Sequence, residues 1–244
     1  MKRIKLDAIE STNTFLKDLV AHTRLGEPTV VTAEMQTKGR GQVGATWESE
    51  LSKNLLFSVF VVPEELLFKE AFFLSYAVSL ALHSTLATYP IPKLFVKWPN
   101  DILSGSSKLG GILIENSFRA GTLKHSIIGI GLNVNQVEFS PSLPNAGSLK
   151  TILGTDVDRE ALLQSLLENI QTQVRNCRPE NFEKIKENFT SLLYKQGIPS
   201  MFKEPSGNVF IGKIVGVSSV GNLQIELENE NIRTFGLKEV ELIK

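Results

Sequence analysis

The hydrophobic positions along the chain change their period several times, and each period predicts an element. Polar and apolar residues alternate over residues 2–6, which predicts a short strand. Apolar residues within 15–20 share one face of a helix, and Ser11 and Thr12 stand where they can cap its first turn. The chain therefore begins with a strand followed by a helix.

Short apolar runs bounded by turn residues predict the buried strands of a sheet, at 29–33, 55–62, 94–97, 110–115 and 126–133. A turn over 119–122 joins the last two as a hairpin. Helical periods predict helices at 66–87, 158–174 and 181–193. The stretches 36–50 and 99–108 have no apolar periodicity and are predicted as loops. Because strands and helices do not alternate regularly, the pattern indicates an α+β fold with a mixed central sheet flanked by helices.

The pattern changes near Gln196. From there, short apolar runs alternate with Gly and Asn turns, at 209–215, 223–227, 232–235 and 240–243. Short strands at such close spacing are typical of a small, mostly antiparallel barrel. The sequence therefore predicts two domains, residues 1–195 and residues 196–244.

Composition narrows the class of protein further. Lys plus Arg and Asp plus Glu both number 26, so the net charge is zero and no global basic field for nucleic acid exists. The single cysteine, Cys177, excludes an intrachain disulfide and fits a reducing cytoplasm, where we expect the protein. The most apolar long stretch, 71–87, contains serines and a histidine and falls short of a membrane span.

A glycine loop, residues 36–50, is the first candidate for chemistry. Its three glycines let the backbone expose consecutive N–H groups, and Lys38 and Arg40 add positive charge among them. The loop suits phosphate or another anion, although a flexible surface loop would show the same glycines. It is not a Walker or a Rossmann motif, because no Gly-Lys-Ser/Thr follows and a long polar loop replaces the expected helix.

Two later segments place polar groups at strand ends. In Lys97-Trp98-Pro99-Asn100-Asp101, the lysine can bind an anion and the aspartate Mg²⁺ or a polar group. An Asn-Asp turn at the end of a strand explains the same residues without a ligand. At the start of the molecule, Glu10-Ser11-Thr12-Asn13 can cap a helix, and a helix N-terminus also offers free N–H groups to a ligand.

Glycines interrupt two apolar strands. Lys108 precedes Gly110-Gly111, and Gly129-Ile130-Gly131-Leu132-Asn133 carries two alternating glycines. Glycine weakens a strand, so a ligand or another part of the chain is expected to approach closely at these points. The amide of Asn133 leaves an apolar run and must find hydrogen-bond partners.

Together and in this order, the segments resemble the biotin protein ligases. The resemblance rests on Glu-Ser-Thr-Asn at 10–13, Gly-Arg-Gly-x-x-Gly with a trailing Trp at 39–47, Lys-Trp-Pro-Asn-Asp at 97–101, Lys-x-Gly-Gly-Ile-Leu at 108–113 and Gly-Ile-Gly-Leu-Asn-Val-Asn at 129–135. It covers residues 10–135 by motif and the remainder by architecture. It implies a catalytic domain like the core of a class II aminoacyl-tRNA synthetase and an SH3-like barrel at the C-terminus.

The resemblance also implies an activity. Such an enzyme makes biotinyl-5′-adenylate from biotin and ATP with Mg²⁺, then transfers biotin to a lysine of the biotin carrier domain of a carboxylase such as acetyl-CoA carboxylase. The catalytic role falls to Arg40 and Lys108. Biotin would be bound by Ser11, Thr12, Asn13, Gln36, Gly39, Arg40, Gly41, Gln42, Lys108, Gly111 and Ile112. ATP or the adenylate would be bound by Arg40, Trp47, Lys97, Asn100 and Asn133, with Asp101 as the Mg²⁺ ligand.

Two features depart from the family pattern. Gln42, Val43 and Ala45 stand where many members carry basic residues, so the glycine loop is less cationic here. The Ser-Thr-Asn motif begins at residue 11, which leaves no room for the winged helix-turn-helix of several members, and a DNA-binding repressor role through it is not expected. We expect the loop to be mobile in the free enzyme and to order over the ligand, and a homodimer through exposed strands is a further possibility.

Three rival readings remain. A lipoate or octanoate protein ligase has a related fold and also acts on carrier lysines, but the segments at 97–101 and 129–135 speak against it. A non-catalytic biotin-binding regulator would not need both Arg40 and Lys108. A nucleic-acid-binding module is the weakest reading, because the sequence has no basic stripe interleaved with aromatic residues.

Overall fold

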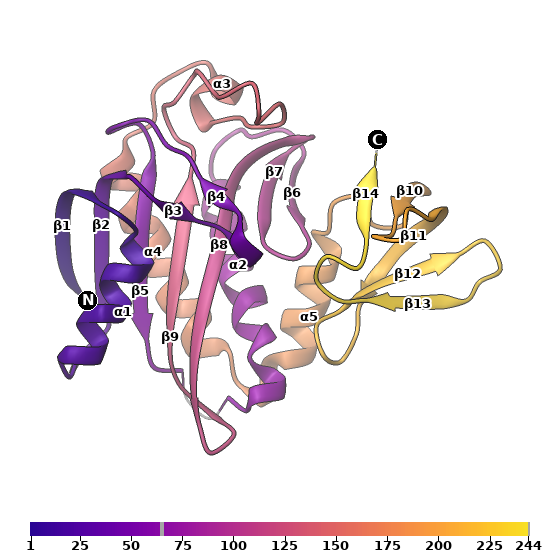
Figure 1. The fold of residues 1–244 in the computed structure, drawn as a ribbon, viewed down its shortest axis with the longest axis horizontal. Helices are drawn as coiled ribbons and strands as arrows, with labels where there is room; N and C mark the ends of the chain where they lie inside the picture. Colours follow the sequence, from indigo (N-terminus) through magenta and orange to yellow (C-terminus); the bar gives the residue numbers. More distant parts are fainter. Residues whose placement is uncertain (64–65, 244) are drawn as a thin grey trace.

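The computed structural model describes residues 1–63 and 66–243. A seven-stranded mixed sheet forms the centre of its larger part (Figure 1). In spatial order its strands are β1 (Lys2–Ile9), β2 (Thr29–Gln36), β5 (Leu55–Val61), β9 (Thr122–Leu132), β8 (Ser107–Arg119), β7 (Asp101–Ser104) and β6 (Leu94–Lys97). The pair β1–β2 is parallel, and every other neighbouring pair is antiparallel. The predicted α+β fold, the mixed sheet and the β8–β9 hairpin are confirmed.

Helices cover both faces of this sheet (Figure 1). Helix α1 (Thr12–His22) lies on one face, over a small cluster of Leu16, Val31, Phe60 and Ile127. The other face carries α2 (Phe72–Leu86), α4 (Arg159–Asn176) and α5 (Phe182–Ser191), and a short helix, α3 (Leu149–Leu153), follows β9. Helix α2 is apolar nearly all round because it is buried between the sheet and the helices α4 and α5.

Some predicted boundaries were wrong. The helix predicted from residue 66 begins only at Phe72: the carbonyl of Leu66 accepts a hydrogen bond from Leu123, and Phe68–Glu70 forms a 3₁₀ turn. The segment 99–108, predicted as a loop, contains β7, whose Ile102 and Leu103 are buried between neighbouring strands. Such burial comes from tertiary pairing, which two apolar residues among polar ones do not reveal.

The glycine loop is also less irregular than predicted. Two short strands within it, β3 (Gly39–Arg40) and β4 (Thr46–Trp47), pair as a hairpin, and residues 42–44 form a 3₁₀ turn between them. In Figure 1 this hairpin crosses in front of β8 and β9. It therefore places the loop over the strands that carry the glycine motifs.

The C-terminal part forms a five-stranded antiparallel sheet, in the order β13 (Ile232–Phe235), β12 (Leu223–Leu227), β11 (Val209–Val217), β10 (Ser200–Lys203), β14 (Glu241–Ile243). The sequence did not predict β10, which has only one buried side chain, Phe202. The two parts share one hydrophobic core, because Phe202, Ile214 and Leu223 belong to the same cluster as α2 and α5. The Trp98 indole N–H also donates to the carbonyl of Gly221 at 3.1 Å.

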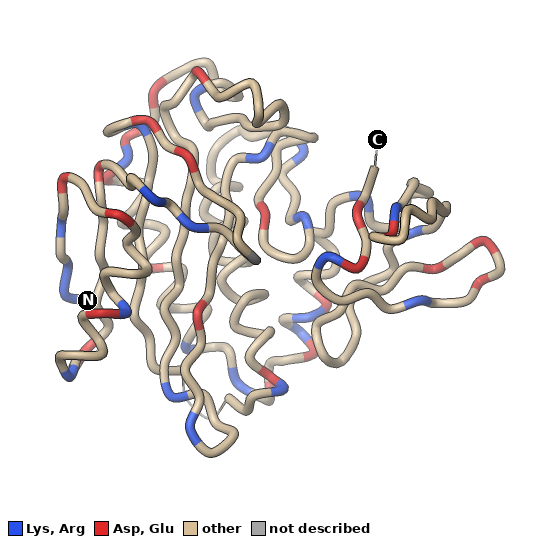
Figure 2. The backbone as a smooth tube through the Cα atoms, in the orientation of Figure 1, with Lys and Arg blue, Asp and Glu red and all other residues tan. Residues whose placement is uncertain are grey.

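Charge is spread evenly over the molecule. Figure 2 shows Lys and Arg interspersed with Asp and Glu along both sheets and the helices. Among the described helices, none is long and apolar enough to cross a membrane. Attraction of an anion therefore depends on a few individual side chains and their surroundings.

Candidate active site

A pocket of about 220 Å³ lies under the glycine loop, against β8, β9 and the start of α1. It brings together most of the site residues predicted from the sequence: Ser11, Asn13, Gln36, Arg40, Gly41, Gln42, Trp47, Asn100, Asp101, Lys108, Gly111 and Ile112. These residues come from segments up to about half the chain apart. The fold, and not their sequence spacing, assembles them.

Glycines form the floor of the pocket. Other side chains of the protein pack so closely against them that a Cβ atom would not fit. A Cβ on Gly131 would overlap the Trp47 indole, and a Cβ on Gly129 would overlap the Asn13 amide. Gly111 also faces the Trp47 ring, from which an added Cβ would lie 3.3 Å. The close approach expected at these glycines is thus present, and Trp47 and Asn13 are what approaches.

One end of the pocket is neutral and polar. The backbone N–H of Thr12 donates to Oε1 of Gln36 at 2.8 Å, and its hydroxyl donates to the same atom at 3.1 Å. The Ser58 hydroxyl lies 2.7 Å from Oγ1 of Thr12 and 2.6 Å from Oδ1 of Asn13. Ser11 occupies the N-cap position of α1 without the expected side-chain capping bond. Thr12 therefore lies behind the pocket wall and orients Gln36, which lines it.

Arg40 reaches toward this neutral end. Its Nη2 lies 3.1 Å from Oε1 of Glu115, and its Nη1 lies 3.3 Å from Oε2 of Glu115 and 3.3 Å from Oγ1 of Thr14. Asn13 donates to the same carboxylate at 3.0 Å. Sequence reasoning missed Glu115, although it lies four residues after Gly111 and hence on the same face of β8.

The ionisation of Glu115 follows from these contacts. Partial burial raises its pKa, but hydrogen bonds from Asn13 and Arg40 and the positive charges of Arg40 and Lys17 lower it more. The pKa therefore lies below the ordinary value of glutamic acid. The carboxyl is ionised at neutral pH and balances the charge of Arg40.

Lys108 forms the other charged end. Its Nζ lies 2.7 Å from Oδ1 of Asp101 and 5.6 Å from the centroid of the Trp47 ring. Asp101 pairs with Gly111 in the β7–β8 register, and the Asn100 amide donates to the carbonyl of Ile112 at 2.6 Å. The Lys108 side chain runs along β8 to Gly111, where an added Cβ would lie 3.7 Å from its Cε. The two predicted catalytic cations, Lys108 and Arg40, therefore line one pocket but pair with different carboxylates, Asp101 and Glu115.

Among the residues described as lining this pocket, Asp101 is the one acidic side chain. The described residues contain no group of three or more His, Cys, Asp or Glu side chains placed to hold a metal ion. A single carboxylate fits Mg²⁺ that arrives on a triphosphate and keeps its waters, and it does not fit a metal held by protein ligands alone.

The remaining predicted residues lie around the pocket. Gly39 pairs with Trp47, and a side chain there would overlap the Trp47 carbonyl. Asn133 is buried, donates to the carbonyl of Gly147 at 2.9 Å, and lines a second pocket of about 270 Å³. Trp47 and Lys108 line both pockets. The two cavities are therefore neighbours with a common wall.

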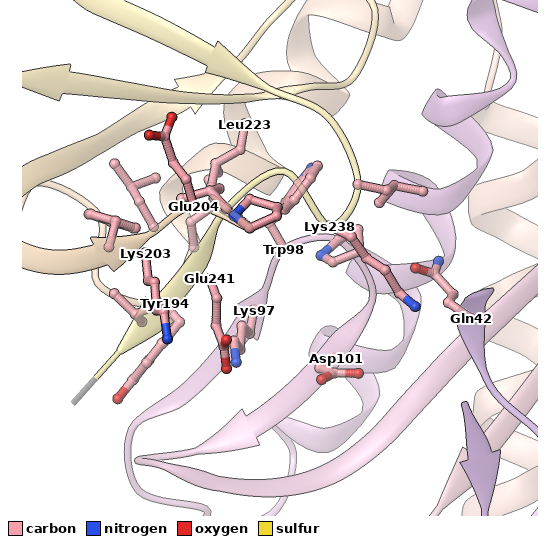
Figure 3. A pocket seen from close by; sticks show the side chains of 18 residues that line it. Gln42, Lys97, Trp98, Asp101, Tyr194, Lys203, Glu204, Leu223, Lys238 and Glu241 are labelled. Atoms are coloured by element: carbon pink, nitrogen blue, oxygen red, sulfur yellow. The ribbon is translucent and has the colours of Figure 1, made fainter. Parts of the chain in front are cut away.

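Lys97 lies outside both pockets. It pairs with Asp101 across the β6–β7 hairpin and lines a cleft of about 610 Å³ between this hairpin and the C-terminal sheet. Figure 3 shows Asp101 and Gln42 on one side of the cleft and Glu204 and Leu223 on the other. Since Asp101 and Gln42 also line the first pocket, the cleft continues from it.

Comparison with known proteins agrees with this site. The model of the Biotin/lipoate A/B protein ligase family matches residues 6–133, which include every residue that lines the first pocket. The fold and the pocket thus define a protein ligase. The chain belongs to the biotin/lipoate A/B protein ligase family.

Individual relatives support the same assignment. The bifunctional ligase/repressor BirA of Bacillus subtilis is 31% identical over 240 residues, which cover 97% of this chain and 72% of that protein. A biotin–[acetyl-CoA-carboxylase] ligase of Mycobacterium tuberculosis is 30% identical over 185 residues, covering 72% of this chain and 67% of that protein. The structure of the Aquifex aeolicus biotin protein ligase in complex with biotin and ATP matches with a TM-score of 0.79 and 29% identity, covering 100% of this chain and 99% of that one. The resemblance drawn from the sequence motifs is confirmed.

Proposed function

We propose that the protein is an ATP-dependent biotin protein ligase, which makes biotinyl-5′-AMP and transfers biotin to a lysine of a biotin carrier protein. The observation that carries the proposal is the polarity of the first pocket. One end is lined by the neutral polar side chains of Ser11, Asn13 and Gln36, and the other by the ammonium group of Lys108. A ligand with a neutral ureido head and a carboxylate tail, as in biotin, matches both ends.

The first reaction joins two anions. A carboxylate oxygen of biotin attacks the α-phosphorus of ATP, a P–O bond forms, and pyrophosphate leaves with the electrons of the bond that breaks. Lys108 at the charged end offsets the repulsion between these groups and stabilises the charge of the transition state.

The Mg²⁺ requirement is part of the proposal. Mg²⁺ bound to the triphosphate would supply further positive charge, and Asp101 is the residue that would hold it. The contact between Asp101 and Lys108 holds the two groups side by side, where both would face the reacting phosphate. Trp47 and Asn133, in the neighbouring pocket, would bind the nucleotide.

The second reaction needs no nucleophile from the protein. The carrier lysine attacks the acyl carbon of the adenylate, an amide bond forms, and AMP leaves. The single cysteine suits no covalent role, since Cys177 is buried at the end of α4 and burial raises its pKa to about 12. Positioning and electrostatics are therefore the main contributions of the protein.

The partner follows from the reaction: a biotin carrier domain of a biotin-dependent carboxylase. The cytoplasmic location, a homodimer and the absence of DNA binding stay predictions. Strand β1 is an edge of the seven-stranded sheet and is the surface we propose for pairing with a second copy.

The test is intact mass spectrometry of a biotin carrier domain incubated with the protein, biotin and Mg-ATP. We expect one biotinyl increment that requires ATP and disappears when the carrier's target lysine is replaced by Arg. Pyrophosphate release without an increment would mean that adenylation is right and the chosen carrier wrong. Activity with lipoate or octanoate in place of biotin would instead indicate the other branch of the family.

A further inference from the structure

Arg40 is held by a group that the reaction does not require. Its guanidinium contacts Glu115 and Thr14, whereas Lys108 in the same pocket pairs with Asp101. A cation that only neutralised the reacting carboxylate and phosphate would be expected beside Lys108. The contacts of Arg40 indicate a different task at the neutral end of the pocket.

Glu115 joins three parts of the fold through its hydrogen bonds. It belongs to β8, it accepts from Arg40 of the glycine loop, and it accepts from Asn13 of α1. Lys17, one turn further along α1, lies 3.7 Å from the same carboxylate. The side chain of Glu115 is only 21% exposed, which limits the screening of these interactions by water.

Backbone hydrogen bonds anchor the base of the glycine loop, whereas side-chain contacts anchor the part nearer its tip. At the base, the backbone N–H groups of Thr37 and Lys38 donate to the carbonyls of Ile9 and Glu10, each at 2.9 Å. Nearer the tip, Arg40 reaches Glu115, and the Trp47 indole rests on Gly131. Arg40 thus ties the tip to one end of the pocket and Trp47 ties it to the floor.

Asn13, which donates to Glu115, is itself held by several contacts. Asn13 is 3% exposed, its amide nitrogen also donates to the carbonyl of Leu113 at 3.3 Å, and its amide oxygen lies against the buried Ser58 hydroxyl. Ser58 in turn contacts Thr12, which holds Gln36. A continuous set of polar contacts therefore joins Glu115 to the residues proposed to bind the biotin head.

We infer that Glu115 is a positioning residue: it holds the glycine loop closed over the neutral end of the pocket through Arg40. This edge of the loop is then ordered before biotin binds, in place of the fully mobile loop expected from the sequence, and the ordering cost of binding falls. The inference rests on the proposed function for its substrate, but its structural core, a loop held by an internal carboxylate, does not depend on it.

The first measurement is the steady-state kinetics of Glu115→Gln. We expect the KM for biotin to rise about 5-fold, the size expected for loss of one partly exposed ion pair. The kcat should stay within about twofold, because a loop tie changes binding of substrate and transition state alike. A fall in kcat at an unchanged KM would overturn the inference.

The chain offers a matched control. Glu160 of α4 is also a carboxylate paired with an arginine and a lysine, Arg3 and Lys5, but these lie on β1 and away from the glycine loop. Glu160→Gln makes the same chemical change and should leave the KM for biotin unchanged. An equal rise in both variants would show a general loss of stability and would contradict a role of Glu115 in the loop.

The second measurement needs no substrate. Trypsin cleaves after Lys38 and Arg40, so limited digestion of the free protein reports loop opening. We expect faster cleavage there in Glu115→Gln than in the wild type and in Glu160→Gln. Equal rates would refute the loop tie even if the protein ligates biotin, and faster cleavage would support it even if biotin is the wrong substrate.

A double-mutant cycle measures the coupling between Glu115 and Arg40, so the result does not depend on the stability of one variant alone. Arg40→Gln breaks the same pair from the loop side, and Glu115→Asp keeps the charge with a shorter reach. The KM rises of Glu115→Gln and Arg40→Gln should not add in the double variant, because both remove one interaction. Additive effects would mean that the two residues act independently.

Discussion

At the scale of single residues, Lys108 and Arg40 look alike in the sequence and differ in the structure. Both are cations beside glycines, and the motif alone assigned both to the reacting groups. Lys108 faces Asp101 and Trp47, whereas Arg40 faces Glu115. The difference depends on a carboxylate 75 positions from Arg40 in the chain, which no local pattern connects with the glycine loop.

Replacing Lys108 tests the charged end. Lys108→Met should lower kcat for pyrophosphate release about 100-fold or more, the range for removing one donor that stabilises a developing charge. Thermal stability should change little, since the side chain is 39% exposed. The control Lys213→Met removes a lysine paired with Glu226 on the C-terminal sheet and should keep kcat. A Lys108→Met enzyme with normal kcat and raised KM would restrict this lysine to binding.

The floor of the pocket makes a steric prediction. Gly131→Ala should push the Trp47 indole off β9, because the added Cβ overlaps the ring. Overpacking of this kind costs about 1–3 kcal/mol. We expect a red shift of tryptophan emission and weaker binding of biotin and ATP. Gly26→Ala, where an added Cβ meets nothing within 4 Å, is the control, and an unchanged emission in Gly131→Ala would be evidence against the packing of Trp47 there.

The low pKa of Glu115 predicts a pH effect with a definite sign. A carboxyl whose pKa is lower in the folded protein stabilises the fold above its unfolded pKa, and this contribution disappears as pH falls through the folded pKa. The wild type should therefore exceed Glu115→Gln in stability at pH 7, and the gap should close below the ordinary glutamic acid pKa of 4.5. Urea unfolding at a series of pH values measures the gap. A gap that widens on acidification would contradict the assigned shift.

At the scale of elements, the sequence predicted those whose burial has a regular period. The central strands β8 and β9 were found because apolar runs at 110–115 and 126–133 mark their middles, and α4 because its apolar residues recur at helical spacing. Strands β7 and β10 were not found, since each has only two apolar residues, Ile102 with Leu103 and Met201 with Phe202, and its pairing partner decides its state. The hairpin in the glycine loop was missed for the same reason, and the site geometry depends on it.

Helix α4 gives a test that is independent of function. Asp158 caps it by accepting from the backbone N–H groups of Glu160 at 2.9 Å and Ala161 at 3.1 Å. Asp158→Ala should lower the free energy of unfolding by about 1 kcal/mol, and Asp158→Asn should restore most of it. The KM for biotin should not move in either variant. Equal stability of all three proteins would show that the cap contributes nothing.

At the scale of the whole molecule, the predicted boundary near residue 195 crosses a continuous core. Phe202 is 1% exposed and packs in the cluster that includes α2 and α5. Composition shifts in a sequence can mark such a boundary, but they do not tell whether two parts share their apolar interior. The two-domain division stays a proposal about the chain's organisation.

A shared core predicts cooperative unfolding. Phe202→Ala should lower stability by about 3–5 kcal/mol, the usual cost of truncating a buried aromatic side chain. Tryptophan fluorescence, which reports the larger part, and far-ultraviolet circular dichroism should show one common transition at a lower temperature. Two separated transitions in the wild type would mean that the parts fold independently.

The wall of Trp47 and Lys108 between the two small pockets has a thermodynamic consequence. Two ligands that contact opposite sides of one side chain have coupled binding free energies when either ligand changes the mobility of that side chain. If occupancy of one cavity immobilises the indole, the second ligand finds that ordering already complete, and each must raise the affinity of the other by the same factor. Immobilisation of this one aromatic side chain by either ligand would therefore produce heterotropic linkage between the two cavities.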